Sequence, residues 1–118
     1  MPVNYITYKG HQLLYVDLTE SKTEKRSLEL LEETKEAYQK ASGKLLVLVN
    51  TRGAYVNSNV SSKMKEYGKL YFKDRAEKRA YVGIEGLKKL IFKAYVKMVG
   101  GNVKVFDDLE EAKEYLIS

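Results

Sequence analysis

The sequence contains no cysteine and no tryptophan, and it has a single histidine. The absence of cysteine excludes a disulfide framework and a thiolate metal site, and it suits a reducing compartment. His11 has no second histidine or cysteine with which to share a metal ion, so we interpret it as an ordinary turn or strand residue. No Ser-His-Asp set, Walker-type phosphate loop or metal-ligand spacing occurs either. We therefore expect a non-enzyme with no catalytic residues, no cofactor and no metal.

Long apolar runs are also missing. No stretch approaches the roughly 20 apolar residues that cross a bilayer, and the opening MPVNYITYKG lacks the apolar run of a signal peptide. We expect a soluble cytoplasmic protein. A chain of 118 residues is long enough to bury one core without metal or disulfide support, so we expect a single domain over residues 1–118.

The net charge of +5 is unevenly distributed. Residues 63–104 carry 12 basic and 4 acidic side chains, whereas residues 105–118 carry 1 and 5. A basic block of this kind attracts nucleic acid or another anionic surface. The alternative is a solvated, lysine-rich helix surface, which the small number of arginines favours.

The apolar pattern predicts a hairpin followed by repeated helix–strand units. Two strands flank a tight turn at Lys9-Gly10. The segment KLLVLVN, residues 44–50, does not alternate, so we expect a central strand covered on both faces. Residues 79–106 read as a strand at 80–84, a helix from Leu87 and a second strand after Gly100-Gly101, which is a parallel crossover. The predicted fold class is α/β, with a mixed, mostly parallel sheet of about five strands and four helices.

Two of the helices have recognisable boundary signals. Ser21-x-x-Glu24 has the form of a capping box, so the first helix starts there or a turn later. Asn57 or Ser58 can cap the second helix, and Gly68 in its interior predicts close packing or an early end. The expected buried stripe of that helix is Val60, Met64, Tyr67 and Tyr71. A charged connector at residues 73–78 follows.

Three segments carry a resemblance to a known family. They are LLVLVN (residues 45–50), AYVGIEGLKKLIFKAY (residues 80–95) and VKVFDDLEEAKEYL (residues 103–116). The sequence resembles the STAS family of bacterial anti-sigma-factor antagonists and sulfate-transporter tails, and within it a branch of small, stand-alone, largely uncharacterised bacterial proteins. The first forty residues agree mainly in element order. The resemblance implies a sheet with crossover helices mainly on one face.

In phospho-regulated members of that family, a serine in an Asp-Ser-Ser-Gly loop at a helix N-terminus accepts phosphate from a partner kinase. The corresponding residues here are Val56-Asn57-Ser58-Asn59, so a serine is present without the flanking Asp and Gly. A phosphate on Ser58 would be favoured electrostatically at the helix N-terminus. The alternative is that Ser58 or Asn57 is simply the helix cap.

The turn Gly83-Ile84-Glu85-Gly86, followed by Lys88 and Lys89, matches the GxxG loop with which KH domains clamp nucleic acid. That loop joins two helices in a KH domain, whereas the residues before Ile84 are strand-like, which disfavours nucleic acid. Amides at the helix start, together with Lys88 and Lys89, could instead hold a small anion. The plain alternative is a tight strand-to-helix turn.

The helix from Leu87 is apolar around most of its circumference. One stripe consists of Leu87, Leu90, Ile91, Ala94, Tyr95 and Met98. Phe92 and Val96 extend the apolar surface beyond it. Either a neighbouring helix covers this second face, or Phe92 and Val96 are exposed and form an interface for a partner.

We therefore expect a non-enzymatic STAS-type module that acts in protein–protein interaction or regulation, with a protein partner or a second copy of the chain. The class-distinct alternative is a small binding domain for an anionic ligand, such as a lipid headgroup, nucleotide or nucleic acid, that uses the basic segment 63–97. Phosphate contacts weaken steeply with ionic strength, so salt-dependent retention on a phosphate surface would separate the two.

Overall fold

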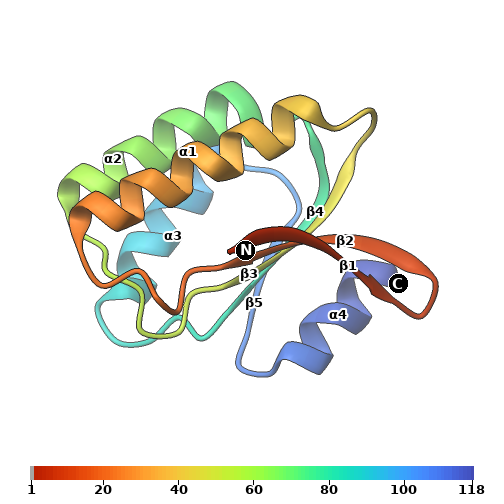
Figure 1. Ribbon diagram of the computed structural model, residues 1–118. Coiled ribbons are helices and arrows are strands. Elements are labelled where there is room, and N and C mark those ends of the chain that lie inside the picture. The colour runs from red at the N-terminus through yellow and green to blue at the C-terminus, as the bar shows by residue number, and fades with distance from the viewer. Residues whose placement is uncertain (1) are drawn as a thin grey trace.

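The computed structural model describes residues 2–118 and contains one five-stranded sheet with helices on both faces (Figure 1). The strands are β1 (Val3–Tyr8), β2 (His11–Asp17), β3 (Leu45–Asn50), β4 (Ala76–Val82) and β5 (Val103–Phe106). The helices are α1 (Glu24–Lys40), α2 (Ser58–Tyr67), the π-helical turn η1 (Gly68–Phe72), α3 (Lys88–Val99) and α4 (Leu109–Ile117). No helix within residues 2–118 is long and apolar enough to cross a membrane.

The strands lie in the order β1-β2-β3-β4-β5. β1 and β2 are antiparallel and the other neighbours are parallel, which confirms the predicted mixed, mostly parallel sheet. Lys9 and Gly10 join the first two strands with φ of 47° and 82°, the left-handed geometry that a two-residue hairpin requires. Across the parallel strands, Val49 is level with Val16 on one side and with Tyr81 on the other.

Three helices cover one face of the sheet and one covers the other (Figure 1). The larger core packs Val47 and Val49 of β3 against side chains of α1, η1 and α3. The smaller core packs Leu48 of the same strand against Ala112 and Leu116 of α4. β3 is therefore buried on both faces, as its continuous apolar run predicts.

β4 begins at Ala76, earlier than predicted, so part of the segment 73–78 is strand and not connector. Strand pairing uses backbone groups, and the exposed side chain of Glu77 points to solvent without ending the strand. Ile84, predicted as the last strand residue, lies beyond β4 but is buried.

α2 ends at Tyr67, and the chain continues through the π-helical turn, in which the Lys73 N–H donates to the Gly68 carbonyl at 2.9 Å. This turn contains one residue more than an α-helical turn. Phe72, and not the predicted Tyr71, therefore follows Tyr67 into the core. Both expectations for Gly68 are confirmed, because α2 ends there and a Cβ atom would lie only 2.9 Å from Tyr95 Oη.

The first helix is capped by Thr23, whose hydroxyl accepts from the Arg26 N–H at 3.1 Å. Ser21 does not cap the helix, and the later of the two predicted starts is the one observed, since α1 begins at Glu24. Ser21 is buried and its hydroxyl lies 2.5 Å from that of Ser27, so it fixes the approach of the chain to α1 and does not cap the helix.

Candidate functional site

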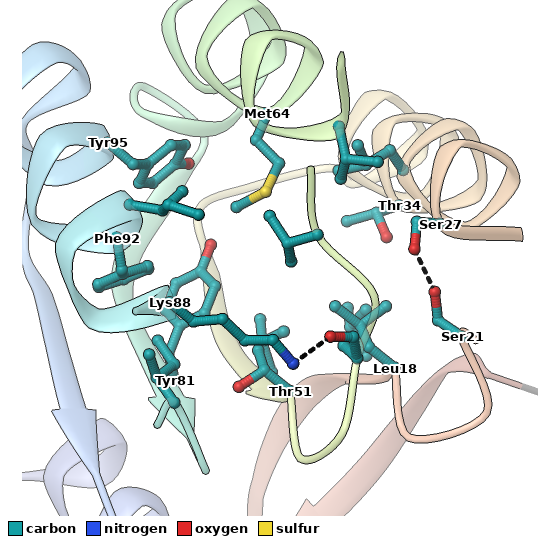
Figure 2. A pocket seen from close by; sticks show the side chains of 18 of the residues that line it. Leu18, Ser21, Ser27, Thr34, Thr51, Met64, Tyr81, Lys88, Phe92 and Tyr95 are labelled. Carbon is teal, nitrogen blue, oxygen red and sulfur yellow. Dashed lines mark hydrogen bonds between the residues drawn. The ribbon is translucent and has the colours of Figure 1, made fainter. Parts of the chain in front are cut away.

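A cavity of about 90 Å³ lies in the larger core, between the sheet and the helices α1, α2 and α3 (Figure 2). Its walls come from β2, β3, β4, α1, α2 and α3 and include Val49, Met64 and Phe92. The lining residues that remain partly exposed include Tyr55 and Ile91. These residues place the mouth between α3 and the loop after β3. This is the carboxyl end of the parallel strands β3 and β4.

The wall of the cavity is apolar even where polar residues contribute to it. The hydroxyl of Thr34 donates to the Leu30 carbonyl at 2.7 Å, and that of Thr51 donates to the Val82 carbonyl at 2.8 Å. Ser27 likewise donates to the Tyr55 carbonyl. Because these groups are satisfied within the protein, they offer little to a polar guest. A cavity of this kind is suited to an apolar group.

Among the described residues that line the cavity, Lys88 alone is charged. It is the first residue of α3 and is half-buried. Its Nζ donates to the Ala54 carbonyl, as the dashed line in Figure 2 shows. None of the ion pairs formed within residues 2–118 involves Lys88. The mouth of the cavity thus carries an ammonium group without a carboxylate partner.

The loop opposite Lys88 is held by its backbone. The Thr51 N–H donates to the Val82 carbonyl at 2.9 Å, which ties the start of the loop to β4. The Tyr55 N–H donates to the Ser21 carbonyl at 2.8 Å, which ties its end to the segment before α1. The Ala54 carbonyl is therefore presented to Lys88 from a backbone anchored at both ends.

Buried phenols form part of the cavity wall. Burial raises the pKa of Tyr38 well above its ordinary value. Burial also raises the pKa of Tyr95, and the adjacent Arg79 only partly offsets this. Both side chains are neutral at physiological pH, so they add no charge to the cavity.

The predicted phosphorylation or capping site lies beside the cavity mouth. Asn57 is the cap of α2, because its Oδ1 accepts from the Val60 N–H at 2.9 Å. Ser58 is the first helical residue and is exposed. The Glu24 carboxylate accepts from the side-chain amides of Asn57 and Asn59. A negative charge is therefore already present at this helix N-terminus, which weighs against a phosphate on Ser58.

The residues of the predicted anion-binding turn are not brought together around one point. Lys88 lines the cavity, whereas Lys89 is exposed. Their backbone N–H groups donate to the carbonyls of Glu85 and Gly86, so these two amides already have partners. Gly83 and Gly86 have φ of 84° and 60°, which is the geometry of a tight strand-to-helix turn.

Phe92 and Val96 do not form the exposed interface that the sequence left open as one alternative. Phe92 is only 7% exposed and packs on Tyr81, with ring centroids 4.5 Å apart. Val96 is half-buried against the same core. The predicted stripe is instead partly in solvent, since Leu87, Leu90 and Met98 are 80%, 65% and 52% exposed. The side of α3 that carries Phe92 and Tyr95 therefore faces the core.

The basic groups of residues 63–97 do not form one surface. Lys63 pairs with Glu66 at 3.5 Å, and Lys78 donates to the carbonyl of Ser118 at 2.6 Å. Arg79 is buried, a position that the sequence analysis did not single out. Exposed lysines at i, i+4 spacing follow the solvent side of α3, namely Lys89, Lys93 and Lys97. Within residues 2–118, no group of three or more metal-ligating side chains occurs.

The fold has a counterpart among solved structures. An uncharacterised protein of the DUF3478 family from Shewanella loihica PV-4, described as having a SpoIIAA-like fold, is similar in structure with a TM-score of 0.70. The two share 13% sequence identity over 97% of this chain and 91% of that chain. At this identity the likeness shows the fold, which is the STAS-like architecture expected from the sequence. No protein-family model and no curated protein matches the chain.

Proposed function

We propose that this protein is a non-enzymatic regulatory module that binds a small apolar molecule in the cavity beneath α1, α2 and α3. The observation that carries the proposal is the apolar cavity of about 90 Å³ beneath α1, α2 and α3. Protein interiors contain few voids larger than a water molecule. A void of this size therefore costs stability unless a ligand fills it.

The position of the cavity supports the same proposal. Its mouth lies at the carboxyl ends of β3 and β4, beside the loop that contains Ala54 and Tyr55. A cytoplasmic location and the absence of enzymatic activity remain predictions within this proposal.

The proposal is tested by titrating the protein with 1-octanol, an uncharged chain, and following the amide and methyl signals of the cavity residues by NMR. We expect saturable shifts at Val49, Met64 and Ile91. Val49→Phe should fill the cavity and weaken binding at least tenfold. Val105→Phe is the matched control, because it makes the same change at a residue that is 43% exposed and does not line the cavity.

Two results would count against this function. One is the absence of shifts in the cavity residues up to the solubility limit of 1-octanol. The other is unchanged affinity in a folded Val49→Phe variant, which would place the binding elsewhere.

A second candidate function is protein binding through the outer side of α3. The exposed apolar side chains of Leu87, Leu90 and Met98 favour it. They run beside the exposed lysines of the same helix, which are Lys89, Lys93 and Lys97. A second copy docked face to face would bring two lysine rows together. Charge complementarity instead supports an acidic partner with apolar anchors.

This second function is tested by sedimentation and by binding to a synthetic acidic amphipathic helix. We expect a monomer in sedimentation, binding of the peptide that falls with added salt, and loss of that binding in Leu87→Asp. A dimer that Leu87→Asp dissociates would assign the surface to a second copy instead. Equal binding of the peptide by the unmodified protein and by Leu87→Asp would exclude this surface as the binding site.

A further inference from the structure

We infer that the ligand of the cavity is a single-chain carboxylate, with the end of its hydrocarbon tail inside and its head group on Lys88. This inference rests on the proposed function, because it assigns the chemistry of the molecule that the cavity holds. It starts from one asymmetry of the lining: the residues described around the cavity are uncharged, except for Lys88, whose ammonium group donates to the Ala54 carbonyl.

The helix directs Lys88 to the cavity and its neighbours away from it. Lys88 shares a face of α3 with Phe92 and Tyr95, at i, i+4 and i+7, and all three line the cavity. The next residue, Lys89, is exposed. The aliphatic stem of Lys88 therefore forms part of the apolar wall, while its charged end lies against the Ala54 carbonyl in the loop after β3.

The partner that Lys88 has in the structure leaves its charge uncompensated. Its Nζ donates to the neutral Ala54 carbonyl, and no ion pair within residues 2–118 includes it. An ammonium group has three donors, so Lys88 can keep this hydrogen bond and donate a second one to a ligand. A carboxylate is a stronger acceptor for it than a hydroxyl, because the bond is then charge-assisted on both sides.

The size of the cavity limits the tail to one chain. An engineered cavity of about 150 Å³ in another protein holds benzene, and this cavity has about 90 Å³. By that comparison this cavity holds only a few carbons of one chain. The remaining methylene groups of a longer chain lie in the mouth, and a molecule with two acyl chains does not fit. A cationic head group would be repelled by Lys88.

The experiment compares three ligands with the same chain and different heads: octanoate, 1-octanol and octylammonium, each titrated by NMR into the full chain. We expect octanoate to bind about tenfold more tightly than 1-octanol, which corresponds to about 1.4 kcal/mol, and octylammonium to bind most weakly. Lys88→Met keeps an unbranched side chain and removes the charge, so it should abolish the preference for octanoate. Lys89→Met is the matched control and should retain it.

The outcomes separate this inference from the proposed function. Equal affinities for octanoate and 1-octanol, unchanged in Lys88→Met, would overturn the carboxylate assignment and leave the apolar cavity as a binding site. Tighter binding of octylammonium would also overturn it. If none of the three ligands binds, both the inference and the proposed function fail. Retained 1-octanol binding in Lys88→Met shows that the variant has kept its cavity.

Discussion

The guanidinium of Arg79 on β4 donates a hydrogen bond of 2.5 Å from Nη1 to the phenolic oxygen of Tyr95 on α3. Both side chains are only 1% exposed. A second donor, Nη2, reaches the Gly100 carbonyl at 3.2 Å, just past the end of α3. The bond therefore joins the sheet to the helix that forms one wall of the cavity. No ion pair among the described residues 2–118 gives this buried guanidinium a carboxylate partner.

Removing the acceptor of this bond should destabilise the protein. Tyr95→Phe leaves a donor of a buried cation unpaired, so we expect a loss of about 1–3 kcal/mol in the free energy of unfolding. Tyr38→Phe is the matched control, since Tyr38 is as deeply buried but is not a hydrogen-bond partner of Arg79. Urea denaturation of the three proteins measures the difference. Equal losses in both variants would mean that the bond to Arg79 contributes nothing specific.

The buried phenols predict a loss of stability at alkaline pH. The pKa values of Tyr38 and Tyr95 are raised in the folded state, whereas an unfolded tyrosine ionises near pH 10. Above about pH 10 the unfolded state has lost protons that the folded state retains, so the free energy of unfolding decreases as pH rises. Each phenol should contribute about 1.4 kcal/mol per pH unit until its folded-state pKa is reached.

Unfolding in urea at pH 9 to 12 measures this slope. Tyr38→Phe removes one of the two groups and should lower the slope by about 1.4 kcal/mol per pH unit. An unchanged slope in that variant would contradict the assignment to Tyr38.

Gly68 should not tolerate a methyl group, although it lies in a helical turn. Alanine is favoured over glycine there by about 1 kcal/mol in propensity. An added Cβ would lie 2.9 Å from Tyr95 Oη and from Val99 Cγ2, and such overpacking costs about 1–3 kcal/mol. We expect Gly68→Ala to lower the thermal midpoint. Gly43→Ala, with nothing within 4 Å of the added atom, should leave it nearly unchanged.

A double-mutant cycle identifies the cause. If the clash with Val99 is responsible, Gly68→Ala should cost less in a Val99→Ala background, with a coupling of at least about 0.5 kcal/mol. Additive effects would locate the cost elsewhere.

An introduced aspartate should have very different effects on the two sides of α3. Phe92→Asp places a carboxylate in the core and should cost more than about 3 kcal/mol. Leu90→Asp replaces a side chain that is 65% exposed, so the expected change is within about 0.5 kcal/mol. Chemical denaturation of both variants tests this, and comparable losses in the two would contradict the observed orientation of the helix.

The sequence predicts the hairpin and the central strand because the residue pattern leaves little choice at these two places. Residues 45–50 are apolar without alternation and are found at the centre of the sheet. Lys9-Gly10 can form little except a tight turn and does so with both φ values positive. In these places local chemistry and global architecture agree.

The orientation of α3 could not be predicted in the same way. Apolar residues surround most of this helix, so hydrophobicity alone allows more than one inward face. The structure selects the side on which Phe92 packs on Tyr81, a residue of another element. Phe72 was missed for a related reason, because the π-helical turn shifts the phase of the helix by one residue. Both errors arise from packing between segments that are distant in sequence.

The cavity could not be predicted at all, because it forms where side chains from several helices and strands together leave a space unfilled. Val49, Met64 and Phe92 each have the character of ordinary core residues. The sequence contains one indication of the cavity, because Lys88 places a charge on the helical face that also holds Phe92 and Tyr95. This indication is meaningful only when the inward face of the helix is known.

The helix α3 alone separates one side of the cavity from solvent. Phe92 and Tyr95 form the cavity wall on its inner side, and Leu87 and Leu90 face water on its outer side. Since a helix of this length moves as a rigid rod, any displacement of its inner side chains shifts the outer ones by a similar distance. An occupied cavity would therefore differ from an empty one in the position of the exposed side chains of α3. No hinge or domain motion is needed for this change.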